Sequence, residues 1–386
     1  MTHPQSQSNG APDEVPLDAA GGPPDNGVSQ AGERTSQEVL VELQGLTKAY
    51  RVGGSFGRGQ VFQAVSDITF SIRAGETFGL VGETGSGKST TGRLALGLER
   101  PTAGKVVFAD RDLALLSAQE LRALRRRMQP ISQDPYSALN GRMHIEDILA
   151  EPFVIHKVAK GKELRLRIES LLELVGLPRD CLERFPHQFS GGQRQRLVIA
   201  RAIALRPEFI VADEPLSALD VSVQAQIINL LRHLQSDFGL TYLFISHDLP
   251  VVRLLCDTVG VMYMGKLVEL ASRDQLFGAP AHPYTHALLA AAPIADPAKR
   301  VERKKLHLAG EAPNTAKSLT GCVFHPRCPL AEPQCVSEEP PMRALGGGHQ
   351  VSCHFGPVSR DTLAAAIERQ EGNAKLQSAT NLEVSR

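Results

Sequence analysis

The sequence predicts an α/β fold with a mostly parallel central sheet. Three short apolar runs have the unbroken hydrophobic character of strands that are covered on both faces, and they are residues 77–81, 209–212 and 241–245. Helical patterns alternate with these runs, one over residues 90–98 and another that ends near Leu205, before Pro207. Strands that alternate with helices are typical of a parallel sheet.

The two ends of the chain are predicted to lie outside this fold. Residues 1–36 are rich in Gly, Pro, Ser, Asp and Gln, and no aromatic residue precedes Tyr50. Such a segment cannot bury enough apolar surface to offset its ordering entropy, so we predict a disordered tail. Residues 360–386 are expected to form a weak helix with a solvated end.

Between the ends, the character of the chain changes several times. Residues 39–72 have strand character around a glycine-rich loop at 53–57. More charged, helical stretches cover residues 117–128 and 160–175. Residues 280–356 then show little periodicity, many prolines and four of the six cysteines, so we expect a small, irregular extension there.

Composition and charge exclude several classes of protein. The 386 residues hold 42 basic and 42 acidic side chains, so the chain lacks the basic excess of a sequence-independent nucleic-acid binder. The longest apolar stretch, residues 287–295, is broken by Pro293 and is too short to span a membrane. Because the N-terminus has no signal-peptide pattern, we expect the six cysteines to be reduced thiols in a cytoplasm.

Residues 82–89 match the phosphate-loop pattern G-x-x-x-x-G-K-[ST], between a strand and a helix as this loop requires. The glycines let backbone N–H groups surround phosphates, Lys88 supplies a positive charge, and Ser89 supplies a Mg²⁺ ligand. We therefore predict that the protein binds a nucleoside triphosphate. The expected contacts are Gly82, Glu83, Thr84, Gly85, Ser86, Gly87, Lys88, Ser89 and Thr90.

Two further strand ends carry polar residues. Asp213 and Glu214 follow the run 209–212, and His247 follows the run 241–245. Ligands of open α/β sheets bind beyond the carboxyl ends of the strands, so these side chains should face the phosphate loop. We expect Asp213 to hold Mg²⁺ through water, Glu214 to polarise the attacking water and His247 to contact the γ-phosphate. The alternatives are a solvated carboxylate pair and a core or cap histidine.

A second anion site is predicted at the start of the helix that ends near Leu205. Two glycines expose backbone amides, and Ser190 adds a hydroxyl at the positive end of the helix dipole. The alternative is an N-cap serine with flexible neighbours. The residues of this second site are Ser190, Gly191, Gly192 and Gln193.

Taken together, these motifs resemble those of ABC-transporter ATPases. They occur in the family's order, as the phosphate loop, Gln133, residues 189–193, residues 213–214, residues 217–220 and His247. The resemblance implies a P-loop NTPase cassette over residues 37–279, with an antiparallel β subdomain and a helical subdomain at about 134–200. It also implies head-to-tail dimers that hold each ATP between one subunit's Lys88 loop and the other's Ser190 motif.

The same resemblance gives roles to two residues that would otherwise be unremarked. Gln133 is expected to touch Mg²⁺ and to sense the membrane subunit, and the ring of Tyr50 is expected to stack on adenine. Without the family, Gln133 would be a surface residue and Tyr50 an ordinary strand tyrosine.

A closer resemblance is to the ATPase subunits of oligopeptide, dipeptide and nickel importers. Residues 133–140, residues 282–285 and the cysteine-bearing extension at 280–356 carry it, before a tail at 357–386, while Gly141 departs from the relatives' Asn-Pro-Arg pattern. It implies ATP hydrolysis that powers peptide import at the cytoplasmic face of the inner membrane. The implied partners are two permeases, a second ATPase subunit (a paralogue or a second copy) and, indirectly, an extracytoplasmic peptide-binding protein.

Four cysteines of the extension form a candidate metal site. They are separated by 5, 6 and 17 residues, which is not the spacing of two Cys-x-x-Cys knuckles. Tetrahedral thiolate ligands suit zinc or an iron–sulfur cluster. The resemblance to peptide importers implies a [4Fe-4S] cluster, with zinc or plain packing thiols as alternatives. These cysteines are Cys322, Cys328, Cys335 and Cys353, whereas Cys181 and Cys256 should be structural.

Other functions remain open to such a cassette. ABC-type ATPases that act on DNA or ribosomes carry a long coiled coil or two cassettes, whereas only 56 residues separate Gln133 from Ser190 and the phosphate loop occurs once. A non-catalytic regulator would lose Lys88, Glu214 or His247. Nickel or another small solute could replace the peptide, and export could replace import, although the cysteine-bearing extension favours import.

Overall fold

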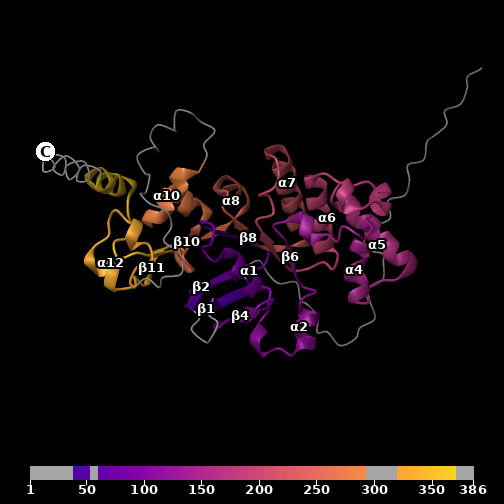
Figure 1. Ribbon diagram of the computed structural model, residues 1–386, viewed down its shortest axis with the longest axis horizontal. Helices are drawn as coiled ribbons and strands as arrows, with labels where there is room; N and C mark the ends of the chain where they lie inside the picture. Colours follow the sequence, from indigo (N-terminus) through magenta and orange to yellow (C-terminus); the bar gives the residue numbers. More distant parts are fainter. Residues whose placement is uncertain (1–37, 53–59, 293–319, 371–386) are drawn as a thin grey trace, which may run out of the picture. The chain divides into compact units, whose positions relative to one another are not determined.

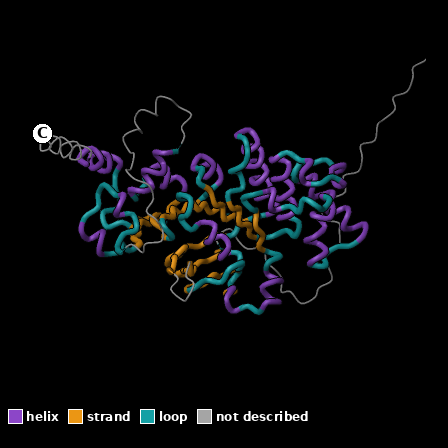
Figure 2. The backbone as a smooth tube through the Cα atoms, in the orientation of Figure 1, coloured by secondary structure: helices purple, strands orange, loops and turns teal. Residues whose placement is uncertain are grey.

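A mixed sheet, parallel toward one edge and antiparallel toward the other, organises the fold (Figures 1 and 2). The structure is a computed structural model that describes residues 38–52, 60–292 and 320–370. The strands of this sheet follow the order β11-β12-β10-β9-β3-β8-β7-β6. The tail predicted at residues 1–36, the loop predicted at 53–57 and the solvated end of the last helix lie outside the described residues.

The parallel strands include the apolar runs that the sequence predicts as buried strands. They are β3 (Thr77–Val81), β6 (Met128–Ile131), β7 (Phe209–Asp213), β8 (Thr241–Ser246) and β9 (Thr258–Tyr263). β3 pairs in parallel with β8 and β9, and β7 pairs in parallel with β6 and β8. The predicted α/β fold class is therefore confirmed.

The two faces of β8 show why these strands are apolar throughout. Leu243 and Ile245 enter a core shared with a second sheet and with helix α1 (Lys88–Ala95), whereas Tyr242 and Phe244 enter a core formed with other helices. Successive side chains of a strand point to opposite faces of the sheet, so a strand that is covered on both faces shows no alternation of polarity.

The second sheet is antiparallel and packs against one of these faces. Its strands follow the order β2-β1-β4-β5, and they are β1 (Val39–Val52), β2 (Gln60–Arg73), β4 (Ala103–Phe108) and β5 (Arg111–Asp112). In β1, Val41 and Leu43 are fully buried while Glu42 and Gln44 are not. This alternation is typical of a strand with one covered face.

Helices line the other face of the parallel strands. They are α3 (Pro135–Ala138), α4 (Ile145–Ile155), α5 (Gly161–Leu174), α6 (Gly191–Ile203), α7 (Val221–Phe238), α8 (Leu249–Leu255), α9 (Arg273–Gly278) and α10 (Pro283–Ala291). Helix α2 (Ala118–Leu124) instead places Leu124 in the core shared with the second sheet, and α12 (Pro333–Ser337) belongs to the C-terminal extension. Helices α3 to α6 occupy the region expected to be a helical subdomain, whose limits stay a prediction. Among the helices of the described residues, none is both long and apolar enough to cross a lipid bilayer.

The C-terminal extension adds a hairpin to the main sheet. Strands β11 (Met342–Gly346) and β12 (His349–Ser352) form it, and β12 pairs with β10 (Lys266–Ser272). The prediction of an irregular extension is therefore incomplete. Strands of four and five residues are too short to show a clear period in the sequence, and one of the two strands that pair with β12 is β10, about 80 positions away in the chain.

A buried carboxylate joins the extension to the cassette. Glu269 of β10 is fully buried, accepts hydrogen bonds from the backbone N–H groups of Ala281 (2.8 Å) and His282 (2.9 Å), and lies 2.8 Å from Nε2 of His349. Burial lowers the pKa of His282 to about 4, so its ring is neutral at pH 7 and accepts a hydrogen bond from the N–H of Tyr284. Buried polar groups need partners, so this network fixes the extension against β10.

Candidate active site

The carboxyl ends of four neighbouring strands bring the predicted site residues together. The order β3-β8-β7-β6 places the phosphate loop, His247, the pair Asp213–Glu214 and Gln133 at successive positions along one edge of the sheet. Parallel strands end at the same edge, so residues that are far apart in the chain become neighbours there.

The phosphate loop follows β3 and depends on glycine at its tightest points. Gly82 and Gly87 have φ angles of 151° and 101°, which other residues rarely adopt. A Cβ atom at Gly82 would lie 2.1 Å from the carbonyl oxygen of Met262, and one at Gly87 would lie 2.2 Å from that of Ala64. Only glycine is compatible with this loop at both positions.

Lys88 lies across the phosphate loop. Its Nζ donates hydrogen bonds to the carbonyl oxygens of Gly82 (2.7 Å) and Glu83 (2.9 Å). Burial lowers the pKa of Lys88, and the negative charges of Glu214, Asp213 and Glu83 oppose that shift. A buried ammonium group within reach of the loop amides is suited to binding the phosphates of a nucleotide.

Ser89 and Asp213 supply adjacent oxygen atoms. The hydroxyl of Ser89 donates to Oδ1 of Asp213 at 2.9 Å. Burial raises the pKa of Asp213, and the hydrogen bond from Ser89 opposes that shift. Hydroxyl and carboxylate oxygens are the ligands that Mg²⁺ prefers, so the chemistry of this pair fits the predicted magnesium site.

Glu214 is held from two sides. Its carboxylate accepts a hydrogen bond from Nε2 of Gln133 at 3.0 Å, and its other oxygen lies 3.2 Å from Nδ1 of His247. Its backbone has a φ angle of 45°, a conformation that costs a non-glycine residue on the order of 1–3 kcal/mol and that clusters at functional sites. Three residues from three strand ends thus meet around one carboxylate.

The Ser190 motif forms the start of α6. Ser190 Oγ accepts from the N–H of Gln193 (3.3 Å), while Gln193 Oε1 accepts from the N–H of Ser190 (3.0 Å), so the two residues form a capping box. A Cβ atom at Gly192 would lie 2.5 Å from the side chain of Val223 in α7. Within the described residues, this motif makes no hydrogen bond to the phosphate loop, so its role across a dimer stays a prediction.

Tyr50 lies in β1, beside the helix that follows the phosphate loop. Its hydroxyl donates to the carboxylate of Glu99, which also pairs with Arg93 of α1, and Lys48 Nζ lies 5.1 Å from the centre of its ring. These contacts orient the ring near α1. Stacking on adenine stays a prediction.

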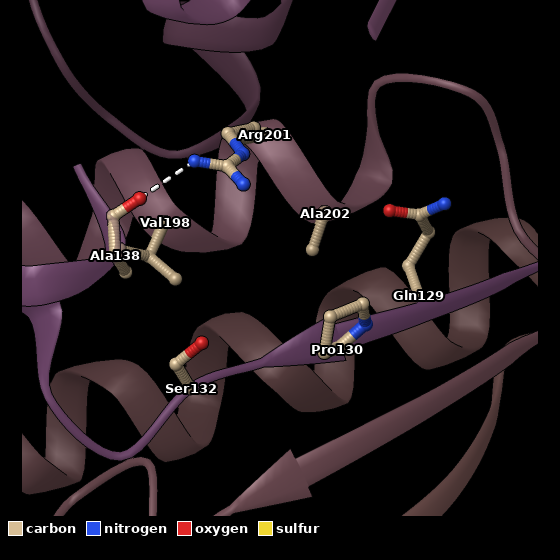
Figure 3. A pocket seen from close by; sticks show the side chains of 7 residues that line it. All are labelled: Gln129, Pro130, Ser132, Ala138, Val198, Arg201 and Ala202. Atoms are coloured by element: carbon tan, nitrogen blue, oxygen red, sulfur yellow. Dashed lines mark hydrogen bonds between the residues drawn. The ribbon is translucent and has the colours of Figure 1, made fainter. Parts of the chain in front are cut away.

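A cavity of about 40 Å³ separates β6 from α6 (Figure 3). Across its edge, Arg201 of α6 donates a hydrogen bond of 2.6 Å to the carbonyl oxygen of Ala138 in α3. The residues that line it are Gln129, Pro130, Ser132, Ala138, Val198, Arg201 and Ala202. A space of this size holds a water molecule and not a nucleotide, so it is a packing gap between β6 and α6.

Two residues at the site escaped the sequence analysis. The guanidinium of Arg327 donates to both carboxylate oxygens of Glu83 at 3.0 Å, and the hydroxyl of Tyr284 accepts from the backbone N–H of Glu83 at 2.9 Å. Both come from beyond residue 280, about 200 or more positions after the phosphate loop. No local pattern in the sequence could reveal these contacts.

The six cysteines, all within the described residues, carry free thiols. Cys181 and Cys256 lie in the hydrophobic core, as predicted. Burial raises the pKa of Cys322 to about 11 and that of Cys328 to about 12. Over residues 38–52, 60–292 and 320–370, no three His, Cys, Asp or Glu side chains are placed to share a metal ion, so this geometry does not support the predicted iron–sulfur or zinc site.

Comparisons with known proteins agree with the geometry of the site. Residues 65–217 match the ABC transporter family, and residues 268–335 match the oligopeptide/dipeptide transporter C-terminal region. The chain is 47% identical over 324 residues to the oligopeptide transport ATP-binding protein AppF of Bacillus subtilis, a match that covers 83% of this chain and 98% of AppF.

Solved structures of ATP-binding cassettes are also similar. A dimer of the cassette MJ0796, in a post-hydrolysis state with ADP and Pi, is 29% identical with a TM-score of 0.55 and covers 61% of this chain and 99% of its own. The protein cbiO1 of Clostridium perfringens, part of the transporter complex cbiONQ, is 25% identical with a TM-score of 0.54 and covers 62% and 91%. The chain therefore belongs to the ABC transporter ATPases, in the group that carries the oligopeptide/dipeptide transporter C-terminal region.

Proposed function

We propose that this ATPase powers the import of peptides through a membrane transporter. The name of its relative AppF and the match of residues 268–335 support the peptide part. The observation that supports ATP hydrolysis is the position of the Glu214 carboxylate. It is held between Gln133 and His247 at the strand ends beside the phosphate loop. A carboxylate in this position can orient a water molecule and accept its proton.

The other residues of the site are proposed to bind the phosphates, Mg²⁺ and the adenine base. Residues 82–90 bind the phosphates, Ser89 and Asp213 hold Mg²⁺ with Gln133, and Tyr50 stacks on adenine. Mg²⁺, when bound, neutralises charge on the phosphates. His247 keeps the Glu214 carboxylate oriented and contacts the γ-phosphate.

The proposed assembly is a head-to-tail pair of ATPase subunits on two permeases at the cytoplasmic face of the membrane. The solved MJ0796 relative is a dimer, which supports the pairing. In such a pair, Ser190, Gly191, Gly192 and Gln193 would complete the nucleotide site of the other subunit. Their backbone amides at the start of α6 suit that role, because a helix N-terminus favours an anion.

Reconstitution tests the proposed substrate. The full chain, with its permeases and second ATPase subunit in liposomes, should hydrolyse ATP several-fold faster when a peptide-loaded binding protein is added. Unloaded binding protein is the control, and nickel salt is the competing solute. Stimulation by nickel and not by peptide would contradict peptide import and favour the nickel-importer alternative.

A [4Fe-4S] cluster on Cys322, Cys328, Cys335 and Cys353 is a separate proposal, with zinc as its alternative. Its support is that all four cysteines fall within residues 322–353 and that the backbone N–H of Cys322 donates to the carbonyl oxygen of Cys335 at 2.8 Å, while the described side chains are not arranged as a metal site. Protein purified without oxygen should then be brown and contain about four iron and four sulfide per chain, the content that four thiolates suit. Cys328→Ser should remove the colour, and Cys181→Ser should keep it. Metal-free wild-type protein would contradict the proposal, and one zinc per chain would favour the alternative.

A further inference from the structure

Glu83 of the phosphate loop is held at three atoms or groups. Its backbone carbonyl accepts from Lys88 Nζ (2.9 Å), its backbone N–H donates to the hydroxyl of Tyr284 (2.9 Å), and its carboxylate accepts from Arg327 (3.0 Å to each oxygen). Lys88 belongs to the loop itself. Tyr284 and Arg327 belong to the segment that follows the cassette.

An aromatic cluster packs beside these contacts. The rings of Tyr263, Tyr284 and Phe324 pack together with centroids 4.7, 5.2 and 5.6 Å apart, and the hydroxyl of Tyr263 lies 3.4 Å from Arg327. Phe324 is only 1% exposed. Packed rings of this kind are rigid, so the position of Arg327 is set by a core that the extension shares with β9 of the cassette.

We propose that Arg327 is a positioning residue for nucleotide binding, through which the cysteine-bearing extension sets the shape and charge of the phosphate loop. The side chain of Arg327 is 12% exposed and that of Glu83 is 34% exposed, so solvent screens this pair only in part. The proposal rests on nucleotide binding at the phosphate loop and does not depend on which solute is transported.

Charge neutralisation is the physical reason why Arg327 should affect nucleotide binding. Glu83 places a negative charge in a loop that must accept phosphates, and that charge is close enough to act on Lys88. Arg327 offsets this charge and fixes the carboxylate on the side of the extension. Without Arg327, the carboxylate is left unpaired beside the bound phosphates, and like charges at close range oppose binding.

The test is a double-mutant cycle on the purified full chain, with MgADP as the probe in calorimetry. Arg327→Gln should raise the Kd for MgADP about 5- to 50-fold, which lies within the usual range of coupling between two sites. In a Glu83→Gln background, where the carboxylate charge is absent, the same change should have less than about a twofold effect. Arg327→Lys, which keeps the charge, should recover part of the loss.

Steady-state kinetics separate positioning from structural damage. Arg327→Gln should raise the KM for ATP and leave kcat within about twofold, because it does not touch Glu214. The matched control is Arg343→Gln, since Arg343 donates to the carbonyl oxygens of Cys353 and Gly356 within the extension and not to the loop. An equal loss of affinity in both variants, or an undiminished effect of Arg327→Gln in the Glu83→Gln background, would overturn the proposal.

Discussion

Replacing Glu214 by Gln is expected to lower kcat for ATP hydrolysis by about 10²–10⁴-fold, the range typical of losing a general base. The amide keeps the size of the side chain and can still accept from Gln133, whose Nε2 lies 3.0 Å from the native carboxylate. It cannot accept a proton from water. The Kd for MgADP should therefore stay within about twofold of the wild-type value.

Glu208→Gln is the matched control for this variant. Glu208 precedes β7, at the opposite end of the strand from Glu214, and pairs with Arg127 away from the phosphate loop. Its loss should leave kcat near the wild-type value, because exposed and half-exposed ion pairs contribute little. Near-normal hydrolysis by Glu214→Gln would remove Glu214 from the role of general base.

Lys88→Ala is expected to weaken nucleotide binding and not only hydrolysis. Lys88 is 4% exposed and its ammonium group lies across the phosphate loop, so its loss should raise the Kd for ATP about 10- to 100-fold, as expected for a charge-assisted hydrogen bond of about 1.5–3 kcal/mol. A ligand at 100 times its Kd stabilises a protein by about 2.7 kcal/mol. At that ATP concentration, a 10- to 100-fold rise in Kd should remove about half to about 85% of this stabilisation, and the thermal shift should shrink accordingly.

Differential scanning fluorimetry with and without ATP measures this loss. Lys105→Ala is the control, because Lys105 is an exposed lysine of β4 that makes no contact with the phosphate loop in the described structure. It should keep the full ATP-dependent shift. An unchanged shift in Lys88→Ala would mean that the nucleotide is held elsewhere.

The phosphate loop and the strand-end residues were predictable from sequence because each is marked by a short, continuous pattern. Residues 82–89 combine a strand, a glycine-rich turn and a helix start within a short window, and each feature has its own chemical pattern. Asp213, Glu214 and His247 were predictable as strand-end residues, since parallel strands present their carboxyl ends at one edge of a sheet. The contacts of Glu214 with Gln133 and His247 agree with that expectation.

The contacts of the C-terminal extension could not be predicted from the sequence. Its hairpin, its buried Glu269–His349 contact and the contact between Arg327 and Glu83 all join segments that are far apart in the chain. Hydrogen bonds across 80 or 244 positions leave no periodicity in either segment. The sequence could indicate that four cysteines lie close together in the chain, and it could not indicate how their sulfur atoms are arranged in space.

For this protein, the sequence by itself determined the fold class, the phosphate loop and the set of residues at the strand ends. Tertiary structure decided which of these residues touch one another, that Ser190 caps α6 without reaching its own phosphate loop, and that the extension reaches Glu83. The physical reason is the range of the forces involved. Backbone conformation and the apolar sequence of a strand are set within a few neighbouring residues, whereas the packing that brings Arg327 to Glu83 depends on a core in which the extension and β9 meet.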